Sequence, residues 1–220
     1  MTSASTVALR EGVAAAARRL ADEGLLVGTA GNVSAREGDL VAVTATGVVL
    51  ADCRADDVTV VSTAGDVVEG RLAPTSEVEL HLGVYADSEA AAVVHTHAPW
   101  STAVACVLDE LPVLHYQQLL LGGAIRVAPY ATFGSAELAG AVREALADRQ
   151  AALMANHGSV AVGASLDKAV ENALLLEWLA QLHHRASALG TPHPLTDEQQ
   201  AAVITAALER NYGTPQENPA

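Results

Sequence analysis

The chain has 220 residues, half of them apolar, and a formal net charge of −14. This acidic excess argues against nucleic acid or an anionic membrane surface as a partner, because both are bound through basic patches. Aromatic residues make up only 3% of the chain, so a core must be built mainly from Ala, Val and Leu. The length favours a single domain spanning residues 1–220.

The two cysteines, Cys53 and Cys106, form no CxxC pair and no disulfide framework, which suits a reducing compartment. Charged residues interrupt the N-terminal segment where a signal peptide would need an apolar stretch. The sequence also has no run of 18 apolar residues that could cross a bilayer. We therefore expect a cytoplasmic protein with inert thiols.

An amphipathic helix is the first element that the sequence predicts. Apolar residues recur at helical spacing at Leu9, Val13, Ala16 and Leu20. Gly24 is expected to end this helix. Short β-branched runs follow over residues 40–68, with AGD as a hairpin turn, which predicts strands with antiparallel pairing.

The segment PTSEVELHL then changes to a helical pattern. Thr75 or Ser76 is the expected N-cap, and Glu77 is expected in the first turn, where the helix dipole tolerates a carboxylate. An apolar strand is predicted at residues 90–95, and Pro99 is expected to start the helix that follows it.

The second half of the chain continues to alternate strands and helices. The expected elements are strands at residues 124–128, 151–156 and 160–163 and helices at 136–147, 166–188 and 197–210. A flexible C-terminal tail is expected from about residue 211. Because no repeat or linker divides the chain, helices on both faces of a mixed sheet are the simplest architecture.

The segment VVHTHAPW places two histidines at the end of a predicted strand. In an extended chain residues i and i+2 share one side, so His95 and His97 would converge with Cα atoms about 7 Å apart. Catalytic zinc sites usually use three protein ligands, and His157, which follows another predicted strand, is the best third candidate. Such a pair alone is weak support, because many histidines are simply hydrogen-bonded. Structural roles are assigned to the others, His81, His115, His183, His184 and His193.

Three short segments carry hydroxyl or amide side chains, GTAGNVS, TATG and PTSE, and the first two also contain glycine. Such segments can present backbone N–H groups and hydroxyls to a phosphate, although each alone could be a turn. None is a Walker loop or a dinucleotide fingerprint, so nucleotide binding is not indicated. Glu77 is the carboxylate nearest to these segments, but a glutamate is also common in the first turn of a helix.

Taken in order, the segments resemble the class II aldolase/adducin family along nearly the whole chain. The matching segments are GTAGNVSAR, TATG, PTSE, VVHTHAPWSTAV, LHYQQ, APYATFG, NHG and NYG. Within the family the likeness is greatest to aldolases acting on L-fuculose phosphate. The resemblance implies an α/β three-layer sandwich, in which helices cover both faces of a mixed, mainly antiparallel sheet.

The activity that the resemblance implies is the reversible cleavage of a ketose 1-phosphate, L-fuculose 1-phosphate or a close analogue. The products would be dihydroxyacetone phosphate and a small aldehyde such as lactaldehyde. His95, His97 and His157 match the zinc-binding histidines of the family. Glu77 matches its catalytic acid/base, and burial is expected to raise the pKa of this carboxyl.

Other positions match residues that contact the substrate or act in the transition state. Tyr116 and Tyr212 match catalytic tyrosines, the second on the C-terminal tail, and Phe133 matches an aromatic of the site wall. The segments that would hold the phosphate contribute Gly31, Asn32, Thr46, Gly47, Thr75 and Ser76. The resemblance also implies one Zn²⁺ per chain, although other divalent ions suit three histidines, and a homotetramer with active sites at subunit interfaces.

This chain departs from the family aldolases at a few positions. Glu209 stands where they have an aromatic before the tail tyrosine, and Gln117 and Gln118 replace apolar residues, which predicts a more polar pocket. Three alternatives remain on the same fold. They are a pentulose-phosphate 4-epimerase, which would carry Asp in place of Glu77, a methylthioribulose-phosphate dehydratase, and a non-catalytic interaction module of the adducin type.

Overall fold

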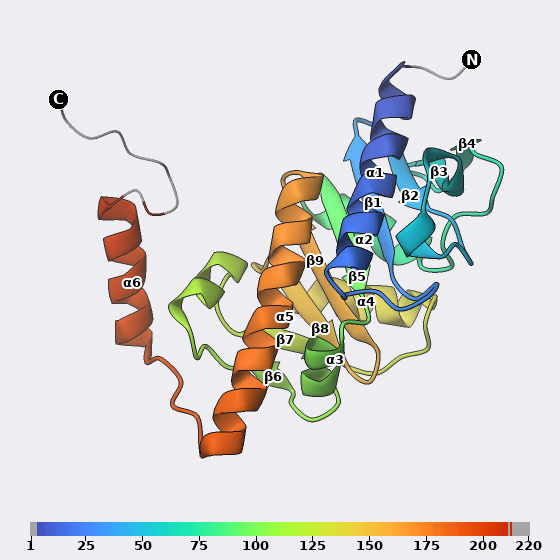
Figure 1. Cartoon of the computed structure of the whole chain (residues 1–220). Helices are drawn as coiled ribbons and strands as arrows, with labels where there is room; N and C mark the ends of the chain where they lie inside the picture. Colours follow the sequence, from blue (N-terminus) through green and yellow to red (C-terminus); the bar gives the residue numbers. More distant parts are fainter. Residues whose placement is uncertain (1–3, 211, 213–220) are drawn as a thin grey trace.

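The computed structural model describes residues 4–210 and residue 212 (Figure 1). Its strands are β1 (Asn32–Glu37), β2 (Leu40–Thr44), β3 (Val58–Ser62), β4 (Val67–Glu69), β5 (Ala92–Thr96), β6 (Glu110–Leu111), β7 (Ile125–Ala128), β8 (Ala151–Met154) and β9 (Gly158–Gly163). Its α-helices are α1 (Ala4–Asp22), α2 (Val78–Asp87), α3 (Pro99–Ala105), α4 (Ala136–Ala145), α5 (Leu166–Leu189) and α6 (Asp197–Glu209). Three short 3₁₀ segments are η1 (Leu50–Asp52), η2 (Ala55–Asp57) and η3 (Tyr116–Leu121).

Within the described residues, the strands form one sheet in the order β4-β3-β2-β1-β5-β9-β8-β7-β6. Neighbouring strands run antiparallel, except β7 and β8, which are parallel. The prediction of a mixed, mainly antiparallel sheet is therefore confirmed. At the centre, β5 pairs with β1 and β9, and His95 lies opposite Asn32 on one side and Val160 on the other.

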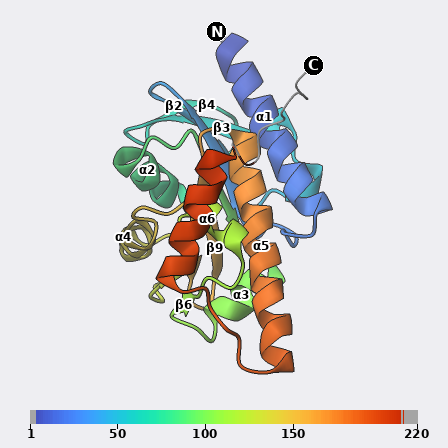
Figure 2. The same cartoon turned by 90° about the vertical axis from the view of Figure 1, so that its left-hand side faces the viewer.

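Helices cover both faces of this sheet. Helices α1, α3 and α5 pack on one face, and α2 and α4 pack on the other (Figures 1 and 2). Successive residues of β5 alternate between the two cores, because Ala92 and Val94 join the α1 and α5 side while Val93 joins the α2 and α4 side. By the same alternation, His95 belongs to the face that α2 covers.

Helix α6 stands apart from the three layers and lies against η3 (Figure 1). It has no buried residue, although Thr196 and Gln199 form a complete capping box at its start. No helix of the described segments is long and apolar enough to cross a membrane. The predicted flexible tail from about residue 211 lies outside the described residues, apart from Tyr212.

Two details of the sequence interpretation were wrong. The stretch NVSARE, for which no strand was predicted, forms β1. Val33 and Ala35 pack in one core, while polar side chains fill the other face of the strand. The stretch therefore lacks the apolar run by which the other strands were predicted. Helix α2 has Glu77 itself at its N-cap, in place of the expected Thr75 or Ser76. The Glu77 side chain makes no capping hydrogen bond and points instead to the partners described below.

Cys53 lies buried beneath α1, and neither it nor the exposed Cys106 is in a disulfide. Burial and the neighbouring Asp57, opposed by Arg18, raise the pKa of the Cys53 thiol to about 11. The thiol therefore stays protonated at neutral pH, which agrees with the predicted inertness of this cysteine.

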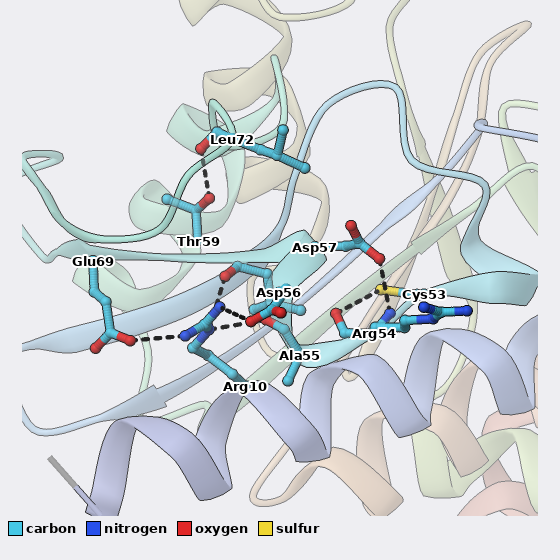
Figure 3. Close-up of polar contacts among 10 residues, drawn as sticks. Arg10, Cys53, Arg54, Ala55, Asp56, Asp57, Thr59, Glu69 and Leu72 are labelled. Carbon is cyan, nitrogen blue, oxygen red and sulfur yellow. Dashed lines mark hydrogen bonds and ion pairs between the residues drawn. The ribbon is translucent and has the colours of Figure 1, made fainter. Parts of the chain in front are cut away.

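Arg10 attaches α1 to the segments that precede and follow β3 (Figure 3). Its Nε donates to the carbonyl oxygens of Ala55 and Val58 at 2.9 and 3.0 Å, and its Nη1 donates to Glu69 at 2.7 Å. The Arg10 side chain is only 13% exposed. A contact with Asp56 adds little, because the side chain of Asp56 is 94% exposed.

We expect Arg10→Ala to lower the free energy of unfolding by about 2 to 3 kcal/mol, because several hydrogen bonds of a largely buried cation are lost together. Urea unfolding of the two proteins measures this difference. Arg19→Ala, on the same helix but paired only with an exposed carboxylate, is the matched control and should change stability by less than about 0.5 kcal/mol. Equal losses in both variants would contradict the anchoring role of Arg10.

Candidate active site

Three histidines converge at the end of β5. Their candidate ligand atoms all lie within 4.8 Å of one another, and the Nε2 atoms of His95 and His97 are 2.9 Å apart. His157 comes from the turn between β8 and β9 and stacks edge-on against both other rings. Among the described residues this is the group of side chains that could hold a metal ion.

The chemistry of these imidazoles suits a metal ligand. Nδ1 of His95 donates to the carbonyl oxygen of Ser159 at 2.9 Å, which leaves Nε2 with its lone pair facing the other histidines. Burial and neighbouring imidazoles lower the pKa of His97 to about 4, and the pKa of His157 is lowered for the same reasons. Neutral rings at physiological pH are the form that binds a cation.

Glu77 completes the cluster from the N-terminal end of α2. Its Oε2 accepts a hydrogen bond from Nδ2 of Asn32 at 2.8 Å and lies 3.2 Å from Nε2 of His95. Its Oε1 lies 3.6 Å from Nε2 of His157 and has no hydrogen-bond partner among the described residues, although it is buried. A buried carboxylate oxygen without a donor, beside three imidazoles, fits a site for a divalent cation or a substrate proton.

The pKa of Glu77 differs from the sequence expectation. Burial does raise it, but the electrostatic interaction with His95, the hydrogen bond from Asn32 and the interactions with His157 and His81 outweigh burial and lower the pKa below its ordinary value. The expected raised pKa was therefore wrong. The carboxylate is ionised at neutral pH, which is the form that accepts a proton.

Hydrogen bonds bring the three candidate phosphate segments together. The side-chain oxygen of Thr44 accepts from the backbone N–H of Val33 at 3.2 Å, and the Thr44 carbonyl accepts from the N–H of Thr75 at 3.1 Å. The N–H of Thr46 donates to the carbonyl of Ala73, also at 3.1 Å. Segments that the sequence separates by tens of residues therefore lie beside one another at the same end of the sheet.

Glycine is required where these segments meet the histidines. Gly31 has φ of 91°, and a Cβ there would lie 2.8 Å from the carbonyl oxygen of His95. A Cβ on Gly158 would lie 2.2 Å from the carbonyl oxygen of Thr96, so β9 could not approach β5 as closely. Both glycines keep His95 and His157 near the phosphate segments.

One cavity of about 290 Å³ joins these parts, which is close to the lower limit for a small-ligand site. The predicted site residues that line it are Gly31, Asn32, Thr46, Gly47, Thr75, Ser76, Glu77, His97, Phe133 and His157. His95 lies beneath it and contacts the cavity through Glu77 and His97. The predicted groups therefore meet at one place, except for two tyrosines.

Tyr116 and Tyr212 lie elsewhere in the chain. Their hydroxyls are 3.1 Å apart, which raises the pKa of Tyr116, and both rings are exposed. They line an apolar groove between η3 and α6, together with side chains such as Leu120 and Ile204. Within one described chain, neither tyrosine lines the cavity that holds Glu77.

Sequence reasoning missed three residues of the site. Tyr130 and Asn156 line the cavity, and Asn156 adopts the left-handed conformation with φ of 55° in the turn just before His157. His81 is fully buried and hydrogen-bonds Asn32, so its assignment as an ordinary structural histidine overlooked its place beside the site. The available signal was its spacing, because His81 follows Glu77 by four residues and so shares its side of the helix.

His81 gives the protein a defined acid sensitivity. Its complete burial, reinforced by His95 and opposed by Glu77, lowers its pKa from 6.5 to about 3. Between these values the unfolded chain binds a proton that the folded chain does not, so stability falls as pH falls. For the metal-free protein we expect this residue alone to remove about 2 kcal/mol between pH 7 and pH 5.

Urea unfolding of wild type and His81→Gln at both pH values measures this contribution, because glutamine does not titrate. The wild type should lose more stability than the variant between pH 7 and pH 5. An identical loss in the two proteins would show that His81 is already protonated in the folded state.

The sequence profile described as Class II Aldolase and Adducin N-terminal domain matches residues 11–184. The chain belongs to the class II aldolase and adducin family. A solved structure of L-fuculose 1-phosphate aldolase matches this class II aldolase with a TM-score of 0.87 and 32% identity, over 94% of this chain and 97% of that one. The expected fold and family are thereby confirmed.

Two curated relatives are similarly close in sequence. The 5-methylthioribulose-1-phosphate/5-deoxyribulose-1-phosphate aldolase of Rhodospirillum rubrum is 39% identical over 202 residues, which are 91% of each chain. The L-fuculose phosphate aldolase of Escherichia coli K12 is 39% identical over 192 residues, which are 86% of this chain and 88% of the relative. These similarities confirm the prediction of a class II aldolase, which is a lyase, and not the alternative of a non-catalytic interaction module. Class II aldolases are metal-dependent.

Proposed function

We propose that this class II aldolase is a zinc enzyme that reversibly cleaves a ketose 1-phosphate, L-fuculose 1-phosphate or a close analogue, to dihydroxyacetone phosphate and a small aldehyde. The observation that carries the proposal is the convergence of three imidazoles on the buried carboxylate of Glu77 at one cavity. Metal ligands, a base and hydroxyl-rich glycine segments are the groups that this reaction needs.

The names of the relatives bear on which analogue is cleaved. Aldolases named for 5-methylthioribulose 1-phosphate and 5-deoxyribulose 1-phosphate stand beside those named for L-fuculose phosphate at the same 39% identity. These sugars share the phosphate and ketone half and differ in the aldehyde half. We therefore place 5-deoxypentulose 1-phosphates among the close analogues, because a pocket discriminates one methylene by only about 1 to 3 kcal/mol.

His95, His97 and His157 would hold the zinc ion through neutral ring nitrogens. When bound, the cation supplies Lewis-acid stabilisation of negative charge on the ketone oxygen. In the synthetic direction, Glu77 removes the proton from the carbon next to that ketone, and in cleavage it returns the proton to the same carbon. Oε1 of Glu77 is the oxygen available for this transfer, because Oε2 is already held by Asn32.

The phosphate would lie against the glycine and hydroxyl segments on the other side of the cavity. Backbone N–H groups of Gly31 and Gly47 and the hydroxyls of Thr46, Thr75 and Ser76 are the groups proposed to hold it. This local arrangement admits an anion although the whole chain carries a net charge of −14. Phe133 would form part of the cavity wall on the aldehyde side.

Tyr116 and Tyr212 are proposed to act from a neighbouring subunit of a homotetramer. Both are exposed and line a groove separate from the cavity of their own chain, and α6 beside them buries none of its residues. An active site at a subunit interface would bring them to the substrate, where Tyr212 would donate a proton to the aldehyde oxygen.

Mixing two inactive variants tests the shared site. We expect Glu77→Gln and Tyr212→Phe proteins, unfolded and refolded together, to regain part of the activity that each lacks, because some mixed interfaces contain both wild-type residues. Each variant refolded alone is the control, and light scattering should give a mass of about four chains. No recovery, or a monomer that is fully active, would contradict the interface site.

Cleavage of a substrate panel tests the proposed function itself. The panel contains L-fuculose 1-phosphate, 5-deoxyribulose 1-phosphate and 5-methylthioribulose 1-phosphate, with coupled detection of dihydroxyacetone phosphate. We expect release of this product from at least one member. Conversion of a pentulose 5-phosphate to its 4-epimer, or loss of water from methylthioribulose phosphate, without release of dihydroxyacetone phosphate would instead support one of the two rival enzymes.

A further inference from the structure

A network of buried, hydrogen-bonded polar side chains extends from Glu77 into the layer between α2 and the sheet. Tyr85 and His81 on α2 both contact the hydroxyl of Ser34 on β1, at 2.7 and 2.6 Å. The other ring nitrogen of His81, Nε2, contacts Oδ1 of Asn32 at 2.5 Å. Asn32 then reaches Oε2 of Glu77 through its Nδ2 at 2.8 Å.

The ionised carboxylate of Glu77 at one end of this network determines which group donates and which accepts in each hydrogen bond. Because an ionised Glu77 only accepts, the Asn32 amide must donate its N–H and keep its oxygen as an acceptor. His81 must then carry its proton on Nε2 and donate to Asn32, so its Nδ1 accepts from Ser34. The Ser34 hydroxyl has donated its proton and in turn accepts from Tyr85.

The side chains of this network are almost completely shielded from solvent. The exposed fractions of Ser34 and His81 are zero, and Asn32 is 4% exposed. The low pKa of His81 agrees with a ring that carries one proton at neutral pH. A reversed Asn32 amide would place its N–H₂ against the donating Nε2 of His81 and its oxygen against the carboxylate, which costs about 1 to 3 kcal/mol for each unsatisfied buried group.

We propose that His81 is a positioning residue for proton transfer. Its Nε2–H fixes the Asn32 amide, so that Asn32 holds Oε2 of Glu77 and leaves Oε1 facing the cavity. His81 does not line the cavity that holds Glu77, and it is not in the group of described residues that could hold the metal. This role rests on the proposed function of Glu77 as the proton-transfer group.

The test compares two side chains of nearly equal length. His81→Met removes the donor to Asn32, and His81→Gln keeps a donor at the end of an unbranched chain. With the wild type and both variants loaded with zinc, kcat and KM for the panel substrate and the zinc content are measured. We expect kcat of His81→Met to fall at least about ten-fold, which is the loss typical when a hydrogen-bond partner of a site residue is removed. KM should stay within about two-fold of the wild-type value, and the zinc content should not change.

His81→Gln should recover kcat to within about three-fold of the wild type. A merely structural role predicts instead that stability changes while kcat per folded, zinc-loaded chain does not. If His81→Met does not fold, Ser34→Ala, which removes the donor to Nδ1, takes its place and should lower kcat in the same way by a smaller factor. A wild-type kcat in folded His81→Met, or in Ser34→Ala where it replaces that variant, would overturn the positioning role.

A second measurement is independent of activity. In the metal-free wild type, ¹⁵N NMR of the histidine rings, assigned by the signals lost in His81→Gln, reports which ring nitrogen carries the proton. We expect the Nε2–H form, and an Nδ1–H form would overturn the proposal. A wild type that cleaves no ketose phosphate would defeat the proposed function and this role together, whereas an active enzyme indifferent to His81→Met defeats the role alone.

Discussion

Glu77→Gln should lower turnover by about 100-fold or more while leaving one zinc ion bound per chain. Glutamine keeps the shape of the side chain and an oxygen that can accept from Asn32, so the cavity and its hydrogen bond survive. It cannot take a proton at neutral pH, and that is the step assigned to the unpartnered Oε1. KM should change far less than kcat, because the phosphate contacts lie elsewhere in the cavity.

The measurement is the rate of dihydroxyacetone phosphate release with zinc content determined on the same samples. Glu79→Gln is the matched control, because it is the same substitution at an exposed position of α2, two residues from Glu77. It should retain full activity. A Glu77→Gln enzyme that keeps its zinc and works at nearly the wild-type rate would remove Glu77 from the chemistry.

His157→Ala should abolish zinc binding and activity together. The variant leaves two imidazoles, His95 and His97, and creates a gap at the turn between β8 and β9. We expect zinc affinity to fall by more than about 100-fold, the upper end of the loss seen when only a supporting partner of a ligand is removed. Catalysis should fall at least as far at limiting zinc.

Zinc titration with a competing chelator measures the affinity, and circular dichroism checks the fold. His193→Ala is the control, because His193 is exposed and belongs to the segment before α6. Unaltered zinc affinity in His157→Ala would mean that the third ligand is another residue, with Glu77 at 3.6 Å from His157 the first to examine.

Sequence patterns predicted most of the fold because the apolar strands and helices carry clear periodicity. Pro99 begins α3 as expected, and the strand predicted to end at His95 is β5, which lies in the middle of the sheet. The pair at i and i+2 converges because β5 is extended up to Thr96. The residues alone made His157 the best candidate for the third ligand, and the family resemblance supported that assignment, since nothing local in NHG specifies a metal ligand.

The remaining features depend on contacts between distant segments. Strand β1 was missed because Asn32 and Ser34 point into a buried layer that is polar, and only His81 and Tyr85 of α2 make that layer stable. The lowered pKa of Glu77 likewise depends on imidazoles and an amide that come from other elements. Burial alone, which is what a sequence suggests, gives the wrong direction.

The three histidines are proposed to hold a cation on which cleavage depends. The most direct test measures metal content and release of dihydroxyacetone phosphate on the same protein as purified, after chelation, and after zinc is restored. We expect one zinc per chain, loss of cleavage in step with loss of zinc, and recovery when zinc returns. Cleavage that continues at an unchanged rate in protein freed of metal would contradict a role of the histidine-bound cation in the reaction.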